Sequence, residues 1–128
     1  MSSKIKILTA IYILIITGIV VIANVKSTQY LLRFGGGIPY FDKIAHFFLM
    51  GIFSLLVNLL LKAKVVSFWK LRYLLGTLIV LTVVTIEEFS QIFVSGRSFD
   101  LGDLVADYLG IFLFGELARF IYGRYLLK

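Results

Sequence analysis

Most of the acidic residues in this chain lie in apolar surroundings. A carboxylate at the centre of a bilayer costs about 2.5–3.5 kcal/mol, so acids in such segments usually face a partner or a cavity. Six of the seven acids lie inside or at the rim of apolar segments: Asp42, Glu87, Glu88, Asp100, Asp103 and Asp107. So many acids in such surroundings indicate a built site.

Helical spacing places several polar residues of the second and third apolar segments on shared helix faces. Asp42 and His46 are four residues apart, as are Glu87 and Gln91, while Glu88 and Gln91 are three apart. One carboxylate of the adjacent glutamate pair is expected to be solvated at the interface, because neighbouring helical residues point in different directions. His46 is open to two interpretations: an interfacial histidine near a helix end, or a group that transfers a proton or binds a ligand.

A third group forms a single stripe at positions i, i+3 and i+7: Asp100, Asp103 and Asp107. Small residues that allow another helix to approach closely run beside it: Gly102, Ala106 and Gly110. An acidic stripe next to a tight packing edge suits a polar pocket walled by neighbouring helices. Arg97 precedes the stripe and is expected to pair with its aspartates, or to bind a phosphate or carboxylate.

The composition is that of an integral membrane protein. The 128 residues are 60% hydrophobic, and the mean hydropathy is +1.00. In a chain this apolar, a net charge of +6 is expected to orient the protein and meet anionic headgroups, not nucleic acid. The absence of cysteine excludes disulfides and thiolate metal sites.

Apolar runs near 20 residues match the thickness of a bilayer core. They predict an all-α, polytopic protein, a bundle of four transmembrane helices in one domain covering residues 1–128. The predicted spans are about 5–25, 42–61, 71–94 and 100–127. The first is expected to be a retained helix because its apolar run is longer than that of a signal peptide.

The basic residues predict the orientation. With a cytoplasmic N-terminus, nine bases lie inside and four outside: Lys26, Arg33, Lys43 and Arg97. Both termini are then cytoplasmic in the cell membrane. Every polar group of the predicted site lies toward the outer face, whereas the inner end has only the Glu116–Arg119 pair.

These residues resemble the VanZ-like family of small bacterial membrane proteins, named for a protein associated with teicoplanin resistance. The family pattern has Asp-Lys-x-x-His at the start of one span, an acidic pair followed by Gln, and an Arg-led run of aspartates ending in Asn-x-x-Gly. The matching residues are Asp42, Lys43 and His46; Glu87, Glu88 and Gln91; and Arg97, Asp100, Asp103, Asp107 and Gly110. One departure is Asp107, which stands where the family usually has Asn and adds a negative charge. The resemblance implies a role in the cell envelope and in glycopeptide antibiotic susceptibility.

Three functions fit the residues. The first is an outward-facing pocket that binds or modifies a lipid-linked or peptidoglycan-related group, with membrane lipid as the surrounding partner. The second is an enzyme acting on a lipid headgroup, with His46 or a carboxylate as general base. The third is a proton- or cation-coupled transporter, which the sparse polar groups of the inner half disfavour.

The sequence specifies neither a cofactor nor a catalytic residue. If the acids hold a metal, oxygen ligands favour Mg²⁺, Mn²⁺ or Ca²⁺ over Zn²⁺, but the spacing identifies none of them. Four short helices enclose little volume, which leaves room for a homodimer.

Overall fold

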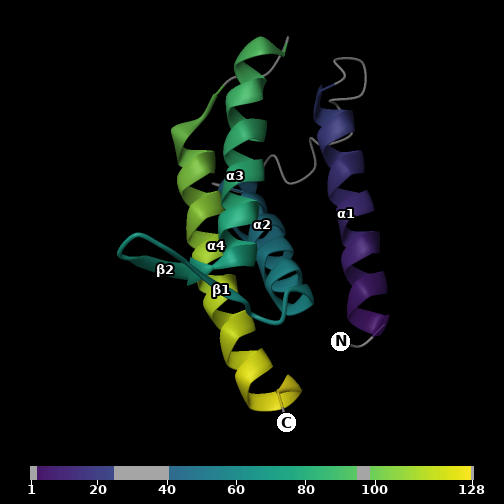
Figure 1. The fold of residues 1–128 in the computed structure, drawn as a ribbon. Helices are drawn as coiled ribbons and strands as arrows, with labels where there is room; N and C mark the ends of the chain where they lie inside the picture. Colours follow the sequence, from purple (N-terminus) through teal and green to yellow (C-terminus); the bar gives the residue numbers. More distant parts are fainter. Residues whose placement is uncertain (1–2, 25–40, 95–98, 128) are drawn as a thin grey trace.

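The computed structural model describes residues 3–24, 41–94 and 99–127. Four α-helices dominate it: α1 (Ser3–Asn24), α2 (Phe41–Leu60), α3 (Leu75–Ser90) and α4 (Leu101–Ile121). A 3₁₀ turn, η2 (Gln91–Phe93), extends α3, and a π-helical turn, η3 (Tyr122–Leu126), extends α4. Helices α2, α3 and α4 lie together, whereas α1 stands to one side (Figure 1). The predicted helical class is therefore confirmed.

Three helical segments are long and apolar enough to cross a membrane: Ser3–Ile22, Lys43–Leu60 and Leu75–Phe93. Large apolar side chains on them are exposed, including Leu14 on α1 and Ile86 on α3. Lipid is the solvent that such a surface suits. Helix α4 is as long but more polar, because it carries four charged residues: Asp103, Asp107, Glu116 and Arg119. A bundle of four membrane-crossing helices thus stays a prediction.

A β-hairpin precedes α3, where the sequence predicted only helix. Strand β1 (Val65–Phe68) pairs antiparallel with β2 (Leu71–Leu74), and Trp69 begins the turn with a φ of 57°. Branched and aromatic side chains favour this extended structure. The predicted span 71–94 is therefore wrong at its start, because its first four residues form β2 and the helix begins at Leu75. The hairpin projects sideways from the helices (Figure 1).

Helices α2 and α4 make the closest contact in the fold. A Cβ atom added to Gly110 would collide with the backbone carbonyl oxygen of Phe47, so only glycine allows this approach. At Gly102 an added Cβ would come within 2.8 Å of Cε of Lys43. The small residues predicted along α4 therefore do permit close packing against α2. This packing fixes how the charged starts of the two helices meet.

An apolar core joins α2, α3 and α4 below those starts. Val57, Val80, Val84 and Ile111 are buried together, with Met50 and Phe53 packed against them. Helix α1 attaches to α2 through the Tyr12 hydroxyl, which donates to the carbonyl oxygen of Leu49 at 2.7 Å. The core separates the charged ends of the helices from the opposite end of the fold.

Candidate functional site

Lys43 connects the start of α2 to the start of α4. Its Nζ donates to Oδ2 of Asp100 at 2.8 Å and to Oδ1 of Asp103 at 2.7 Å. The Lys43 and Asp103 side chains are 28% and 15% exposed, so both ion-pair partners are largely withdrawn from solvent. Bonds between charged partners are stronger than neutral ones. One ammonium therefore neutralises charge from two neighbouring carboxylates.

Asp100 also caps α4. Its Oδ1 accepts the backbone N–H of Gly102 at 2.8 Å, which satisfies a donor that the helix itself leaves free. The Lys43 ammonium, followed by this N–H, holds the pKa of the Asp100 carboxyl below its ordinary value. Asp100 therefore stays ionised over the physiological range, and its ion pair with Lys43 persists there.

His46 lies one turn after Lys43 and faces the same stripe of α4. Its Nδ1 is 2.9 Å from Oδ1 of Asp107, and its Nε2 is 3.7 Å from Oδ2 of Asp103. Asp107 is only 2% exposed, whereas the His46 side chain retains 25% exposure. A carboxylate hydrogen-bonded to one ring nitrogen fixes the orientation of the imidazole. Asp107 therefore positions His46 from inside the fold.

The end of α3 contributes Glu88, which is fully buried. Its Oε1 accepts the backbone N–H of Asp100 at 3.2 Å, and its Oε2 accepts Nε2 of Gln91 at 3.3 Å. Gln91 also donates to both carboxylate oxygens of Glu87 at 3.1 Å. Glu88 thus connects the end of α3 to the start of α4. The side chain of Glu87 is less buried than that of Glu88.

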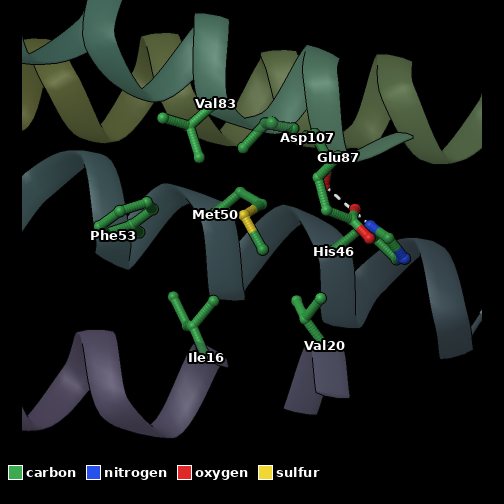
Figure 2. A pocket seen from close by; sticks show the side chains of 9 residues that line it. Ile16, Val20, His46, Met50, Phe53, Val83, Glu87 and Asp107 are labelled. Atoms are coloured by element: carbon green, nitrogen blue, oxygen red, sulfur yellow. Dashed lines mark hydrogen bonds and ion pairs between the residues drawn. The ribbon is translucent and has the colours of Figure 1, made fainter. Parts of the chain in front are cut away.

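A cleft of about 70 Å³ runs beside these groups (Figure 2). One end is polar, with His46, Glu87 and Asp107, and the rest is apolar. Helices α1, α2 and α3 supply the apolar wall: Ile16, Val20, Met50, Phe53, Val83 and Val84. A space with one polar end and apolar walls suits the junction between a polar headgroup and an alkyl chain.

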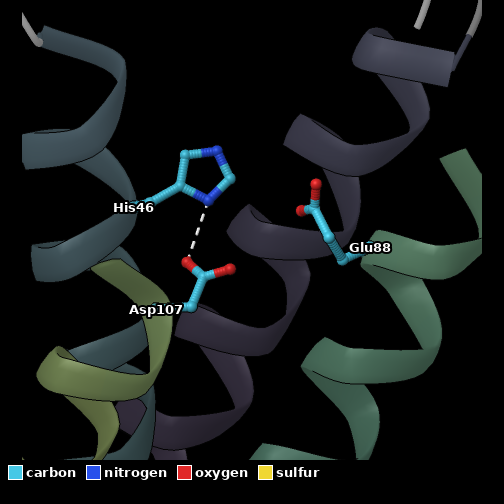
Figure 3. A group of neighbouring side chains, drawn as sticks. All are labelled: His46, Glu88 and Asp107. Atoms are coloured by element: carbon cyan, nitrogen blue, oxygen red, sulfur yellow. Dashed lines mark hydrogen bonds and ion pairs between the residues drawn. The ribbon is translucent and has the colours of Figure 1, made fainter. Parts of the chain in front are cut away.

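Three side chains from three helices converge beside this cleft: His46 from α2, Glu88 from α3 and Asp107 from α4 (Figure 3). One nitrogen or oxygen atom of each lies within 4.8 Å of the other two. These are residue types that coordinate divalent metal ions in proteins. Among the described residues, these three side chains form the group whose spacing could hold a metal ion.

The structure brings together most of the residues that the sequence singled out. The hydrogen-bonded or ion-paired members are Lys43, His46, Glu87, Glu88, Gln91, Asp100, Asp103 and Asp107. Two predicted members cannot be placed in this way. Arg97 lies outside the described residues, and so does the side chain of Asp42, whose backbone lies in the first turn of α2. Within the described part of the chain, Lys43 is the cation that pairs with Asp100 and Asp103, and the expected pairing of Arg97 stays a prediction.

A second polar group was missed by the sequence analysis. Ser54, Asn58 and Thr77 are fully or almost fully buried between α2, α3 and α4. Nδ2 of Asn58 donates to Oγ1 of Thr77 at 3.0 Å, and Oγ of Ser54 donates to the carbonyl oxygen of Ile111 at 2.8 Å. A signal was present, because Ser54 and Asn58 continue the four-residue spacing of His46 along α2.

Comparison with known proteins identifies the family. The profile described as VanZ/LLP1 matches residues 5–122, which include every described member of the polar cluster. Neither a curated protein nor a solved structure matches the chain. The match and the three apolar helices identify a membrane protein. The chain belongs to the VanZ/LLP1 family.

Proposed function

We propose that this protein crosses the cell membrane four times and uses an outward-facing polar pocket to bind or modify a cell-envelope group. The group is lipid-linked or related to peptidoglycan. The carrying observation is the meeting of His46, Glu88 and Asp107 at the polar end of an otherwise apolar cleft. An amphipathic ligand would place its headgroup at this end and its chain along the apolar wall.

The charges of the cluster indicate what such a headgroup offers. Carboxylates accept hydrogen bonds from hydroxyl and ammonium groups, while Lys43 supplies an ammonium to oxygen atoms. Sugar, amino-acid and phosphate groups of envelope precursors carry all of these partners. Membership of the VanZ/LLP1 family supports a role in susceptibility to glycopeptide antibiotics such as teicoplanin.

A headgroup enzyme is the second candidate. The observation that favours it is the 2.9 Å contact between Nδ1 of His46 and Oδ1 of Asp107. An imidazole oriented by a carboxylate can act as a general base through its other nitrogen. In that function His46 would accept a proton from a hydroxyl or water that attacks the headgroup. Binding requires less of the site, so it remains the first proposal.

The transporter is disfavoured by the apolar core. Buried Val80, Val84 and Ile111 lie between the charged cluster and the polar group around Asn58. A proton or ion relay needs polar groups or water at intervals along its path. In the described part of the chain, this apolar layer interrupts such a path.

Native mass spectrometry with a bacterial lipid extract tests binding. We expect the purified wild-type protein to retain an envelope lipid that the Asp103→Ala variant loses. The matched control is Glu116→Ala, which removes an exposed carboxylate from the other end of α4. Equal lipid retention by all three proteins would contradict the proposed pocket. A mass change in the released lipid would favour the enzyme over the binding protein.

Cells expressing the protein provide the functional test. Replacing His46, Glu88 or Asp103 by Ala, or Arg97 by Ala, is expected to return teicoplanin susceptibility to that of cells without the protein. Membrane insertion of each variant is checked by fractionation, so that lost function is separated from lost protein. Unchanged susceptibility in all four variants would make the cluster purely structural.

A further inference from the structure

We propose that His46, Glu88 and Asp107 bind one divalent transition-metal ion, Zn²⁺ or Mn²⁺. Each residue comes from a different helix, and the three side chains face a common space (Figure 3). Metal ligands drawn from separate helices would hold α2, α3 and α4 together at this end of the fold. A bound metal ion would give the buried carboxylates of Glu88 and Asp107 a function as ligands.

The distances are close to those of a coordination shell. Metal–ligand bonds of about 2.0–2.2 Å place neighbouring ligand atoms about 3.0–3.5 Å apart. Nδ1 of His46 and Oδ1 of Asp107 are already 2.9 Å apart. An oxygen of Glu88 lies within 4.8 Å of a ring nitrogen of His46 and of a carboxylate oxygen of Asp107.

An independent observation concerns the second oxygen of Asp107. The residue is 98% withdrawn from solvent, and its Oδ1 contacts His46. The other oxygen, Oδ2, is directed toward the side of Glu88 in Figure 3. A carboxylate oxygen that faces the other two side chains is placed to bind a cation between them.

The surrounding groups orient the ligands as an outer shell does around a metal. A metal-bound histidine usually directs its other ring nitrogen at a carboxylate or carbonyl. Here Nε2 of His46 is 3.7 Å from Oδ2 of Asp103, which Lys43 holds through its other oxygen. Glu88 is held by Gln91 and by the backbone of Asp100. Each proposed ligand therefore has a described partner that fixes its direction.

Charge favours a cation in the same place. The described cluster contains one ammonium and one imidazole, from Lys43 and His46. The carboxylates in the same cluster are more numerous than these two bases: Glu88, Asp100, Asp103 and Asp107. A divalent ion would offset charge that these two bases leave uncompensated.

The histidine narrows the choice of metal. Imidazole suits Zn²⁺ and related transition ions, whereas Mg²⁺ and Ca²⁺ prefer oxygen ligands alone. Two carboxylates with one imidazole match Zn²⁺ or Mn²⁺. Three protein ligands also leave positions for an oxygen of a bound group. The inference rests on the proposed function only in assigning those positions to an envelope headgroup.

Metal titration of the purified full-length protein tests the site. After treatment with a chelator and its removal, the wild type is titrated with Zn²⁺, Mn²⁺ and Mg²⁺ in detergent. We expect one equivalent of Zn²⁺ or Mn²⁺ to bind in preference to Mg²⁺. The isosteric variants Asp107→Asn and Glu88→Gln should weaken binding by more than about tenfold, the smallest loss typical of a disturbed metal shell. Glu116→Gln, the matched control, should bind as the wild type does.

Several results would overturn the site. These are the absence of saturable metal binding, a preference for Mg²⁺, wild-type affinity in both Asp107→Asn and Glu88→Gln, or a loss in Glu116→Gln as large as theirs. Circular dichroism checks the folding of every variant. If Asp107→Asn does not fold, His46→Gln, with a more exposed side chain, decides the same question. The metal titration contains no lipid, so its result is independent of the lipid-retention experiment. Metal binding without lipid retention would reject only the proposed function. Lipid retention without metal binding would reject only the metal site.

Discussion

At the residue scale, the three aspartates of α4 and its N-terminal cap are stabilised by different basic partners. Asp100 and Asp103 lie at the positive end of α4 and share the Lys43 ammonium. Asp107 lies deeper, where its partner is His46. The negative charge of Asp107 is therefore placed beside the one histidine of the sequence. Each of these three aspartates therefore has a described basic neighbour.

Replacing Lys43 by Met measures the worth of the shared ammonium. The free energy of unfolding should fall by roughly 1.5–3 kcal/mol, the range for hydrogen bonds to charged groups. The measurement is reversible unfolding in mixed micelles, followed by circular dichroism. A double-mutant cycle with Asp103→Asn should show favourable coupling between the two wild-type side chains. Lys70→Met, in the exposed hairpin turn, is the control, and an equal loss there would contradict the specific role of Lys43.

At the scale of the elements, the site depends on how closely α2 and α4 approach. Gly110 allows contact with the backbone at Phe47, one residue after His46. This contact sets the depth of Asp107, which lies three residues before Gly110 on the same helix. Small residues on α4 therefore position the His46–Asp107 pair, although they carry no chemistry of their own.

The Gly110→Ala variant tests this dependence. Because the added methyl group would overlap the carbonyl oxygen of Phe47, the helices must separate, and we expect a loss of about 1–3 kcal/mol. Thermal unfolding in one detergent measures it. Gly18→Ala is the matched control, since an added Cβ there meets nothing within 4 Å; it should be neutral or stabilising because alanine favours helix. Equal behaviour of the two variants would refute the close approach.

At the scale of the whole molecule, apolar runs were sufficient to predict the helices, because burial in lipid leaves a strong compositional signal. The sequence also predicted that His46 and the acids would lie at one depth, and the contact of His46 with Asp107 is consistent with that prediction. The hairpin was missed because Leu71–Leu74, with leucine at both ends, fits the start of a helix as well as a strand.

Rotation of the helices could not be predicted. Glu87 and Glu88 are adjacent, and only the packing of α3 against α4 decides that Glu88 is the buried one. The same limit hid the contact of Asn58 with Thr77, because the four-residue spacing along α2 indicates a shared face but not which helix that face contacts. Tertiary packing, not periodicity, selects which polar side chains face one another.

Orientation in the membrane is the last prediction, and it decides which side the pocket faces. Bases outnumber acids most clearly between α2 and α3, where Lys62, Lys64, Lys70 and Arg72 accompany the hairpin. The positive-inside rule places that segment in the cytoplasm. In this cysteine-free chain, Ser67→Cys in β1 should therefore resist an impermeant thiol reagent in intact cells, whereas Ser95→Cys, between α3 and α4 in the sequence, should react. Both should react after permeabilisation, and the reverse pattern in intact cells would turn the pocket toward the cytoplasm and remove its access to envelope groups.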